Sequence, residues 1–287
     1  MAQVGGDLIE PILDRLPPDT STLCIIPHRG LGVLPLHAIP VNGTASPTHL
    51  ASRFAVVYAA SLSEITTPRL GHAPATRSLL TVRPTADPPL HFAERECAAV
   101  REHFAHHLHL GGNGASRGQV AETVANFTYA HFACHGTADW NDIGKSAVTL
   151  SDGSLTMDEL CRKDLSNVRL VCLSACETGI IDFKHLPNAS IGMATSLRKA
   201  GANCVLSALW TVSDAATFLT MKAFYAHHLR GRLEPGAALA RAQEWLRDLT
   251  SKDVVAELGA PVATVGADPE HPFSEPFYWA PFRINGL

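Results

Sequence analysis

The chain has 287 residues, of which 46% are hydrophobic, and a formal net charge of −4 at pH 7. A chain of this length holds one or two domains with a sizeable core, and its charge supplies no basic surface for direct contact with nucleic acid. No apolar stretch reaches the roughly 20 residues of a membrane span, and the N-terminus lacks the pattern of a secretory leader. The seven cysteines form no Cys-x-x-Cys pair, so we expect reduced thiols in a cytoplasmic protein.

In the first third of the chain, the sequence pattern predicts one helix and three strands. The amphipathic stretch over residues 7–16 predicts a short helix that stops before Pro17-Pro18. Continuous apolar runs over residues 23–27, 54–58 and 79–82 are typical of strands buried on both faces.

Helices and strands alternate through the rest of the chain. Apolar residues at helical spacing predict two helices, through Cys97, Val100 and Phe104 and through Val120, Val124 and Phe127. The elements expected next are a strand at 128–133, a short ribbon at 148–155, a helical turn at 157–160, a strand at 168–173, a helix at 190–199, a strand at 204–209, and helices at 214–229 and 236–249.

This alternation predicts an α/β fold in which a mostly parallel sheet of about six strands has helices on both faces. No internal repeat divides the sequence, and residues 1–287 are expected to form a single domain. The tail over residues 266–287 contains Phe273, Phe277, Tyr278, Trp279 and Phe282. Because so apolar a segment is unfavourable in solvent, we expect it to pack back on the domain.

Two motifs follow predicted strands and break at glycine-containing turns. They are His131-Phe132-Ala133-Cys134-His135-Gly136 and Leu173-Ser174-Ala175-Cys176-Glu177-Thr178-Gly179. In open parallel sheets the loops at the carboxyl ends of the strands build the site, and neighbouring strands lie about 5 Å apart. We therefore expect the His135 imidazole and the Cys176 thiol to meet at one edge of the sheet.

This pair has the chemistry of acyl transfer. A thiol is a good nucleophile as the thiolate, and a nearby imidazole both promotes its formation and later protonates the leaving amine. The N–H of Gly136 is unobstructed by a side chain, so it is expected to bind a developing oxyanion together with the amide of Cys176. The alternative is that Cys176 is a further core cysteine and His135 an ordinary loop histidine.

The same two motifs resemble the hallmark motifs of the CHAT domain, a caspase- and separase-like cysteine peptidase module. The resemblance covers nearly the whole chain and includes Ile26-Pro27 through Leu34-Pro35-Leu36, Leu197 to Asp214, Ala237 to Ala242, and Tyr278-Trp279-Ala280-Pro281-Phe282. It implies a caspase-like three-layer sandwich in which Cys176 attacks the peptide carbonyl and His135 is the general acid/base. It implies no third catalytic side chain, no cofactor and no metal.

The resemblance also implies a function. It is that of a cysteine endopeptidase, which cleaves a protein substrate in a regulated, bacterial-type signalling or defence pathway. Members commonly carry N-terminal helical repeats that control the peptidase. Here the sequence starts only a few residues before the first predicted helix, so we expect either a stand-alone or excised catalytic module or a regulatory domain or partner chain elsewhere. The loop over residues 180–188 is short, which predicts activity without internal cleavage. The alternative function is a catalytically silent module for protein–protein interaction.

Substrate recognition is predicted at Trp210 and Asp214. Both follow the strand at 204–209, in a loop that lines the substrate cleft of caspase-like enzymes. Asp214 is expected to meet a basic substrate side chain or, alternatively, to stabilise the first turn of the next helix. Asp139 and Asp152 are equally ambiguous, with solvated loop residues as the default.

Three other patterns compete with the cysteine–histidine pair. The stretch from Gly114 to Gly118 matches the Gly-x-Ser-x-Gly pattern of serine hydrolases, but Ser116 is expected to cap the amide of Gln119 at a helix start. The histidines at 103, 106, 107 and 109 lack the further ligands of a zinc site and are expected at a solvated helix end. Residues 111–114 lack the Gly-Lys-Ser/Thr ending of a phosphate-binding loop.

Overall fold

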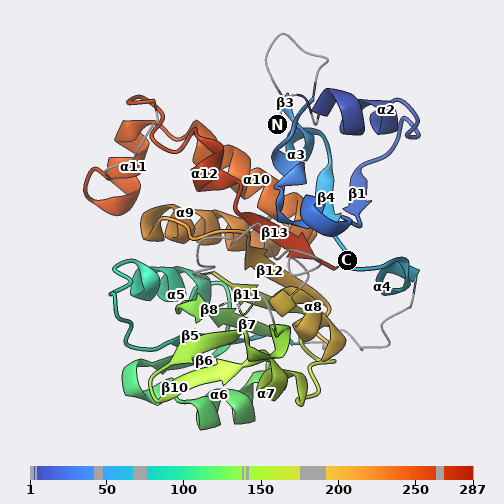
Figure 1. Cartoon of the computed structure of the whole chain (residues 1–287). Coiled ribbons are helices and arrows are strands. Elements are labelled where there is room, and N and C mark those ends of the chain that lie inside the picture. Colours follow the sequence, from blue (N-terminus) through green and yellow to red (C-terminus); the bar gives the residue numbers. More distant parts are fainter. Residues whose placement is uncertain are drawn as a thin grey trace.

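An eight-stranded sheet forms the centre of the computed structural model, which describes residues 3, 5–41, 48–66, 76–137, 139, 142–174, 192–262 and 268–286. The strand order is β1-β4-β13-β12-β11-β7-β5-β6 (Figure 1). In that order the strands are Thr22–Ile25, Ala55–Tyr58, Phe282–Asn285, Cys204–Ala208, Leu170–Leu173, Tyr129–Phe132, Ser78–Arg83 and His106–Gly111.

The sheet consists of two parallel halves that run in opposite directions. Strands β12, β11, β7, β5 and β6 are parallel neighbours and form the five-strand half. Strands β13, β4 and β1 are also parallel to one another and form the three-strand half. The two halves meet where β13 pairs with β12 in antiparallel orientation. All five strands of the larger half therefore end at the same edge of the sheet.

The predicted α/β class and all six predicted strands are confirmed, and two further strands complete the sheet. The helix predicted through Phe104 ends at Arg101, and β6 follows it, so the prediction of a histidine-rich helix end is wrong. As an edge strand, β6 exposes His106, His107 and Leu108 and has no continuous apolar run. Strand β13 escapes prediction because it interrupts its apolar residues with Arg283.

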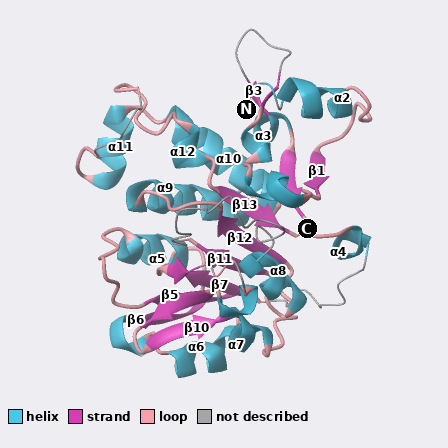
Figure 2. Ribbon diagram, viewed as in Figure 1, coloured by secondary structure: helices cyan, strands magenta, loops and turns pink. Residues whose placement is uncertain are grey.

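Helices cover both faces of the sheet, as predicted (Figure 2). On one face lie α5 (Ala93–Arg101), α9 (Asp214–Tyr225) and α10 (Pro235–Asp248). On the other lie α6 (Arg117–Thr123), α7 (Met157–Cys161) and α8 (Gly192–Lys199). Helix α9 is buried on nearly every side because it packs against both α5 and α10, which explains its uniformly apolar sequence.

A small antiparallel sheet begins directly after β7. It contains β8 (Gly136–Thr137), β9 (Ala147–Leu150) and β10 (Gly153–Thr156), and it confirms the predicted ribbon. Further elements include a π-helical turn at Gly5–Ile9, α2 (Glu10–Leu13), β2 (Pro40–Val41), β3 (Thr48–His49), α3 (Leu50–Arg53), α4 (Leu62–Thr66), α11 (Ser251–Leu258) and α12 (Pro276–Trp279). Within these described ranges, no helix is long and apolar enough to cross a membrane.

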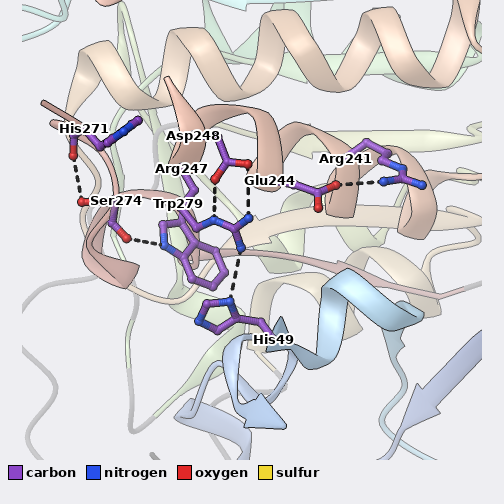
Figure 3. Close-up of polar contacts among 8 residues, drawn as sticks. All are labelled: His49, Arg241, Glu244, Arg247, Asp248, His271, Ser274 and Trp279. Atoms are coloured by element: carbon purple, nitrogen blue, oxygen red, sulfur yellow. Dashed lines mark hydrogen bonds and ion pairs between the residues drawn. The ribbon is translucent and has the colours of Figure 1, made fainter. Parts of the chain in front are cut away.

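The tail packs on the domain, as predicted. Its buried aromatic side chains are Phe273, Tyr278, Trp279 and Phe282. Figure 3 shows the His49 ring beside Trp279, with ring centroids 4.8 Å apart, and Arg247 bonded to His49 Nδ1 at 3.3 Å. Burial and the nearby Arg247 charge lower the pKa of His49. These contacts attach the N-terminal residues to α10 and α12.

Candidate active site

The side chains of β7 alternate between the two faces of the sheet. Residues 130, 132 and 134 pack with α6, α7 and α8. Residues 129, 131 and 133 contact elements of the opposite face, which carries α5. His135 follows this strand at the carboxyl edge and is only 8% exposed. The strand therefore delivers the imidazole to the place that the sequence predicts.

A backbone carbonyl orients the His135 ring. Nε2 lies 2.8 Å from the carbonyl oxygen of Pro88, in the segment 84–92 between β5 and α5. Because a carbonyl oxygen only accepts hydrogen bonds, Nε2 carries the proton. In a neutral ring the lone pair is then on the buried Nδ1 atom, which is the nitrogen that can take a proton from a thiol. The sequence contained no signal for this partner, since every residue has a carbonyl.

Strand β11 ends beside β7 at the same edge. The two strands are parallel neighbours, with Leu173 opposite Phe132. Pairing continues one residue further, because both the amide and the hydroxyl of Ser174 donate to the Phe132 carbonyl at 3.1 Å. Cys176, two residues later in the sequence, lies outside the described residues. The predicted adjacency of the two strands is confirmed, and the role of Cys176 stays a prediction.

Gly136 presents its amide away from its strand partner. The amide of Thr149 donates to the His135 carbonyl at 2.8 Å, and Gly136 lies opposite Val148 in the β8–β9 ladder. This register makes Gly136 and Val148 a pair without hydrogen bonds between them. The Gly136 N–H therefore points away from β9, and its role as an oxyanion donor stays a prediction.

Trp210 and Asp214 lie between the end of β12 and the start of α9, at the same sheet edge. The Trp210 indole N–H donates to the Phe277 carbonyl at 3.0 Å. The Asp214 carboxylate accepts from the Phe92 amide at 2.8 Å, and burial raises the pKa of Asp214. This bond attaches segment 84–92 to α9. Asp214 also begins α9, as the alternative prediction required, and a substrate contact for either residue stays a prediction.

The competing patterns have structural roles in the described part of the chain. Ser116 caps α6 by accepting from the Gln119 amide, as predicted, and Asp152 accepts from the Arg117 amide in the same turn. Asp139 accepts from the Asp142 amide within a local turn. Among the described residues, no three histidine, cysteine or acidic side chains are grouped in a way that could hold a metal ion.

Comparison with known proteins identifies the family. Residues 3–286 match the CHAT domain family. The chain is a CHAT domain. The comparison with curated proteins found no match.

This CHAT domain has the fold of known cysteine peptidases. The Saccharomyces cerevisiae separase–securin complex matches with a TM-score of 0.57 and 11% identity, over 90% of this chain and 15% of the separase-complex chain. The complex of the pro- and mature domains of Porphyromonas gingivalis RgpB matches with a TM-score of 0.58 and 8% identity, over 100% of this chain and 69% of that one. At such low identity these matches show the fold alone, which is the predicted caspase-like one.

Proposed function

We propose that this CHAT domain is a cysteine endopeptidase in which Cys176 is the nucleophile and His135 the general acid/base. The observation that supports the proposal most is the orientation of His135, whose Nε2–H donates to the Pro88 carbonyl, so that the lone pair of the neutral ring is on Nδ1. Cys176 follows Ser174 by two residues, and two residues of extended chain span at most about 7 Å. The bond from the Ser174 amide to the Phe132 carbonyl holds Ser174 itself beside the strand that precedes His135.

The proposed reaction has two acyl-transfer steps. His135 Nδ1 takes the proton of the Cys176 thiol, and the thiolate attacks the peptide carbonyl to form a tetrahedral oxyanion. The amides of Gly136 and Cys176 donate to that oxyanion. The protonated His135 then gives its proton to the leaving amine, and a thioester remains. In the second step His135 deprotonates a water molecule, which hydrolyses the thioester and regenerates the thiol.

The Pro88 carbonyl serves both steps. It restrains rotation of the imidazole, and its partial negative charge stabilises the protonated ring that forms after the thiol loses its proton. A carboxylate holds the equivalent nitrogen in many serine peptidases. A backbone carbonyl provides orientation without a full negative charge, which suits a nucleophile that is itself an anion.

Substrate choice and regulation belong to the same proposal. Trp210 and Asp214 contact the residues that precede or follow the scissile bond, with Asp214 next to a basic side chain. The active enzyme is a single uncut chain in the cytoplasm, in a signalling or defence pathway. A regulatory partner controls it, and both similar structures support such control because they are complexes, one with securin and one with a pro-domain.

A thiol-reactive peptide electrophile tests the catalytic pair. In wild type, Cys176 should be labelled at neutral pH much faster than the other six cysteines. Burial raises the pKa of Cys24, Cys97, Cys161 and Cys204, to about 12 for Cys204, so these thiols stay protonated. Cys176→Ala and His135→Ala should each abolish fast labelling and peptide cleavage.

Cys134→Ala is the matched control, because Cys134 precedes His135 directly but packs on the opposite face of the sheet. It should keep the wild-type labelling rate. Slow and equal labelling of all seven cysteines would instead support the silent protein-interaction module. A cleavage-site profile from a peptide library would then identify the residue preferred before the scissile bond, and Asp214→Asn should weaken a preference for basic residues.

A further inference from the structure

The proposed mechanism does not use His131, the first residue of the motif that ends in His135. Its side chain is fully buried, and Nε2 lies 2.8 Å from Glu96 Oε1 on α5, which is 2% exposed. On the other side of the ring, the Tyr225 hydroxyl lies 3.3 Å from Nδ1. Burial keeps the pKa of Tyr225 well above its usual value, so this hydroxyl stays protonated. A buried ionisable pair is costly to desolvate, so stability alone is a weak explanation for this one.

Three contacts align β7 with the segment that runs past it. His131 contacts Glu96, Ala133 packs with Ala93 and Cys97, and His135 bonds to Pro88. The residue numbers rise along β7 while they fall along the facing segment. The segment from Pro88 to Cys97 therefore lies antiparallel along one face of β7 and of the three residues that follow it, with a contact at every second residue from His131 to His135.

Two of these three contacts are hydrogen bonds, which depend on direction as well as distance. One is the His135–Pro88 bond itself, and the other is the Glu96–His131 pair. Packing of Ala93 on Ala133 tolerates a shift along the strand, because small apolar surfaces fit in many positions. A hydrogen bond of 2.8 Å between buried groups does not, since even a fraction of the 5.4 Å helical pitch breaks it. The pair therefore sets the position of α5 along β7.

We infer that His131 and Glu96 are positioning residues for His135. By fixing α5 along β7 they hold segment 84–92 so that the Pro88 carbonyl accepts from His135 Nε2. The inference rests on the proposed function for its catalytic consequence, but its structural part, the orientation of the His135 ring, is independent of catalysis.

A second set of contacts fixes the other side of the same segment. The Phe92 amide bonds to Asp214, and the Phe92 ring stacks on Phe218 with centroids 5.9 Å apart. The Arg95 guanidinium lies over both rings and donates to the last carbonyls of α11. These contacts attach the start of α5 to α9 and α11. Among the described residues, the Glu96–His131 pair alone attaches α5 to β7 by a polar bond.

The test replaces the pair without leaving a lone buried charge. Glu96→Leu combined with His131→Leu fills the same space with apolar side chains, a change that buried ion pairs often tolerate without loss of stability. Glu96→Gln is the conservative variant, because its amide oxygen still accepts from His131 Nε2. Tyr129→Phe is the matched control, since it removes a buried 3.1 Å hydrogen bond to His228 on the same face of the same strand, away from Pro88.

Side-chain NMR of the His135 ring is the readout that needs no activity. Wild type, Glu96→Gln and Tyr129→Phe should show a slowly exchanging Nε2–H, whereas the Leu/Leu double variant should lose it. A double variant that keeps the wild-type Nε2–H signal would overturn the inference. This result stands even if the wild-type protein cleaves no peptide.

Peptide cleavage gives the second readout. The double variant should lower kcat by about 10²-fold, the effect of misplacing a catalytic group by roughly 1 Å, with KM nearly unchanged. Glu96→Gln should restore kcat to within about threefold of wild type, because a hydrogen bond of the same geometry remains. If wild type is active and the folded double variant is equally active, the positioning role is wrong and the proposed function stands. If wild type is inactive, the proposed function fails and the NMR result alone decides.

Discussion

The two halves of the sheet both bury polar side chains, but they arrange them differently. In the five-strand half, His131 lies buried in β7, and His135 follows the same strand at its carboxyl edge. In the three-strand half, the buried polar groups bond to one another. The Tyr58 hydroxyl bonds to His37 Nδ1 at 2.8 Å and accepts from the His37 amide at 3.0 Å, and Arg283 lies over the Tyr58 ring.

Strand direction explains the difference. The five strands of the larger half end at one edge, where their loops converge, whereas β1, β4 and β13 run the other way and end at the opposite edge. In the described part of the chain, the strands of the smaller half therefore end away from the candidate site. The smaller half covers β12, which would otherwise be an exposed edge strand. One half is thus arranged for chemistry and the other for stability, and variants can test this division.

One contribution to the pH dependence of folding should come from His37, which bonds to Tyr58 in the three-strand half. Burial and the Arg283 charge lower the pKa of His37 to about 3, below the 6.5 of an exposed ring. Between these values the unfolded chain binds more protons, so stability should fall as the pH drops from 6.5 towards 3, by up to roughly 1.4 kcal/mol per unit. Urea unfolding at several pH values measures this slope. His37→Asn should flatten it, and an unchanged slope would contradict the assignment to His37.

Tyr58→Phe should lower the free energy of unfolding by about 2 kcal/mol, because it leaves two buried polar groups of His37 without their partner. The labelling rate of Cys176 should not change, since this network does not reach the edge that carries His135. Thermal unfolding and labelling on the same samples check both statements. A slower labelling rate at unchanged stability would contradict the assignment of chemistry to one half and stability to the other.

Ser116→Ala should have the smallest effect. The substitution removes the hydroxyl that accepts from the Gln119 amide at the start of α6, on the five-strand half. This loss should lower the free energy of unfolding by about 1 kcal/mol. Peptide cleavage should stay at the wild-type level, because the cap lies at the start of α6 and not at the end of β7 or β11. A folded Ser116→Ala protein without activity would revive the serine-hydrolase hypothesis.

The sequence predicted the features that depend on local patterns. Continuous apolar runs located six of the eight strands. All of these except the edge strand β1 lie inside the sheet, where a strand buried on both faces must be apolar throughout. The cap at Ser116 was predictable because a capping residue and the amide that it caps are three positions apart in the sequence. Strand β6 was missed because an edge strand half exposed to solvent can be rich in histidine, and β13 because its buried Arg283 resembles a surface residue.

By itself, the sequence determined that a histidine and a cysteine follow two buried strands, and its motifs indicated the family. Only the tertiary structure showed that β7 and β11 are parallel neighbours, that Pro88 orients His135, and that Glu96 bonds to His131. Pro88 lies 47 residues from His135 in the chain, and Glu96 lies 35 residues from His131. Such pairings depend on how helices pack against strands, which no local pattern of side chains encodes. The Pro88 partner is harder still to predict, because a backbone carbonyl is the same group in every residue.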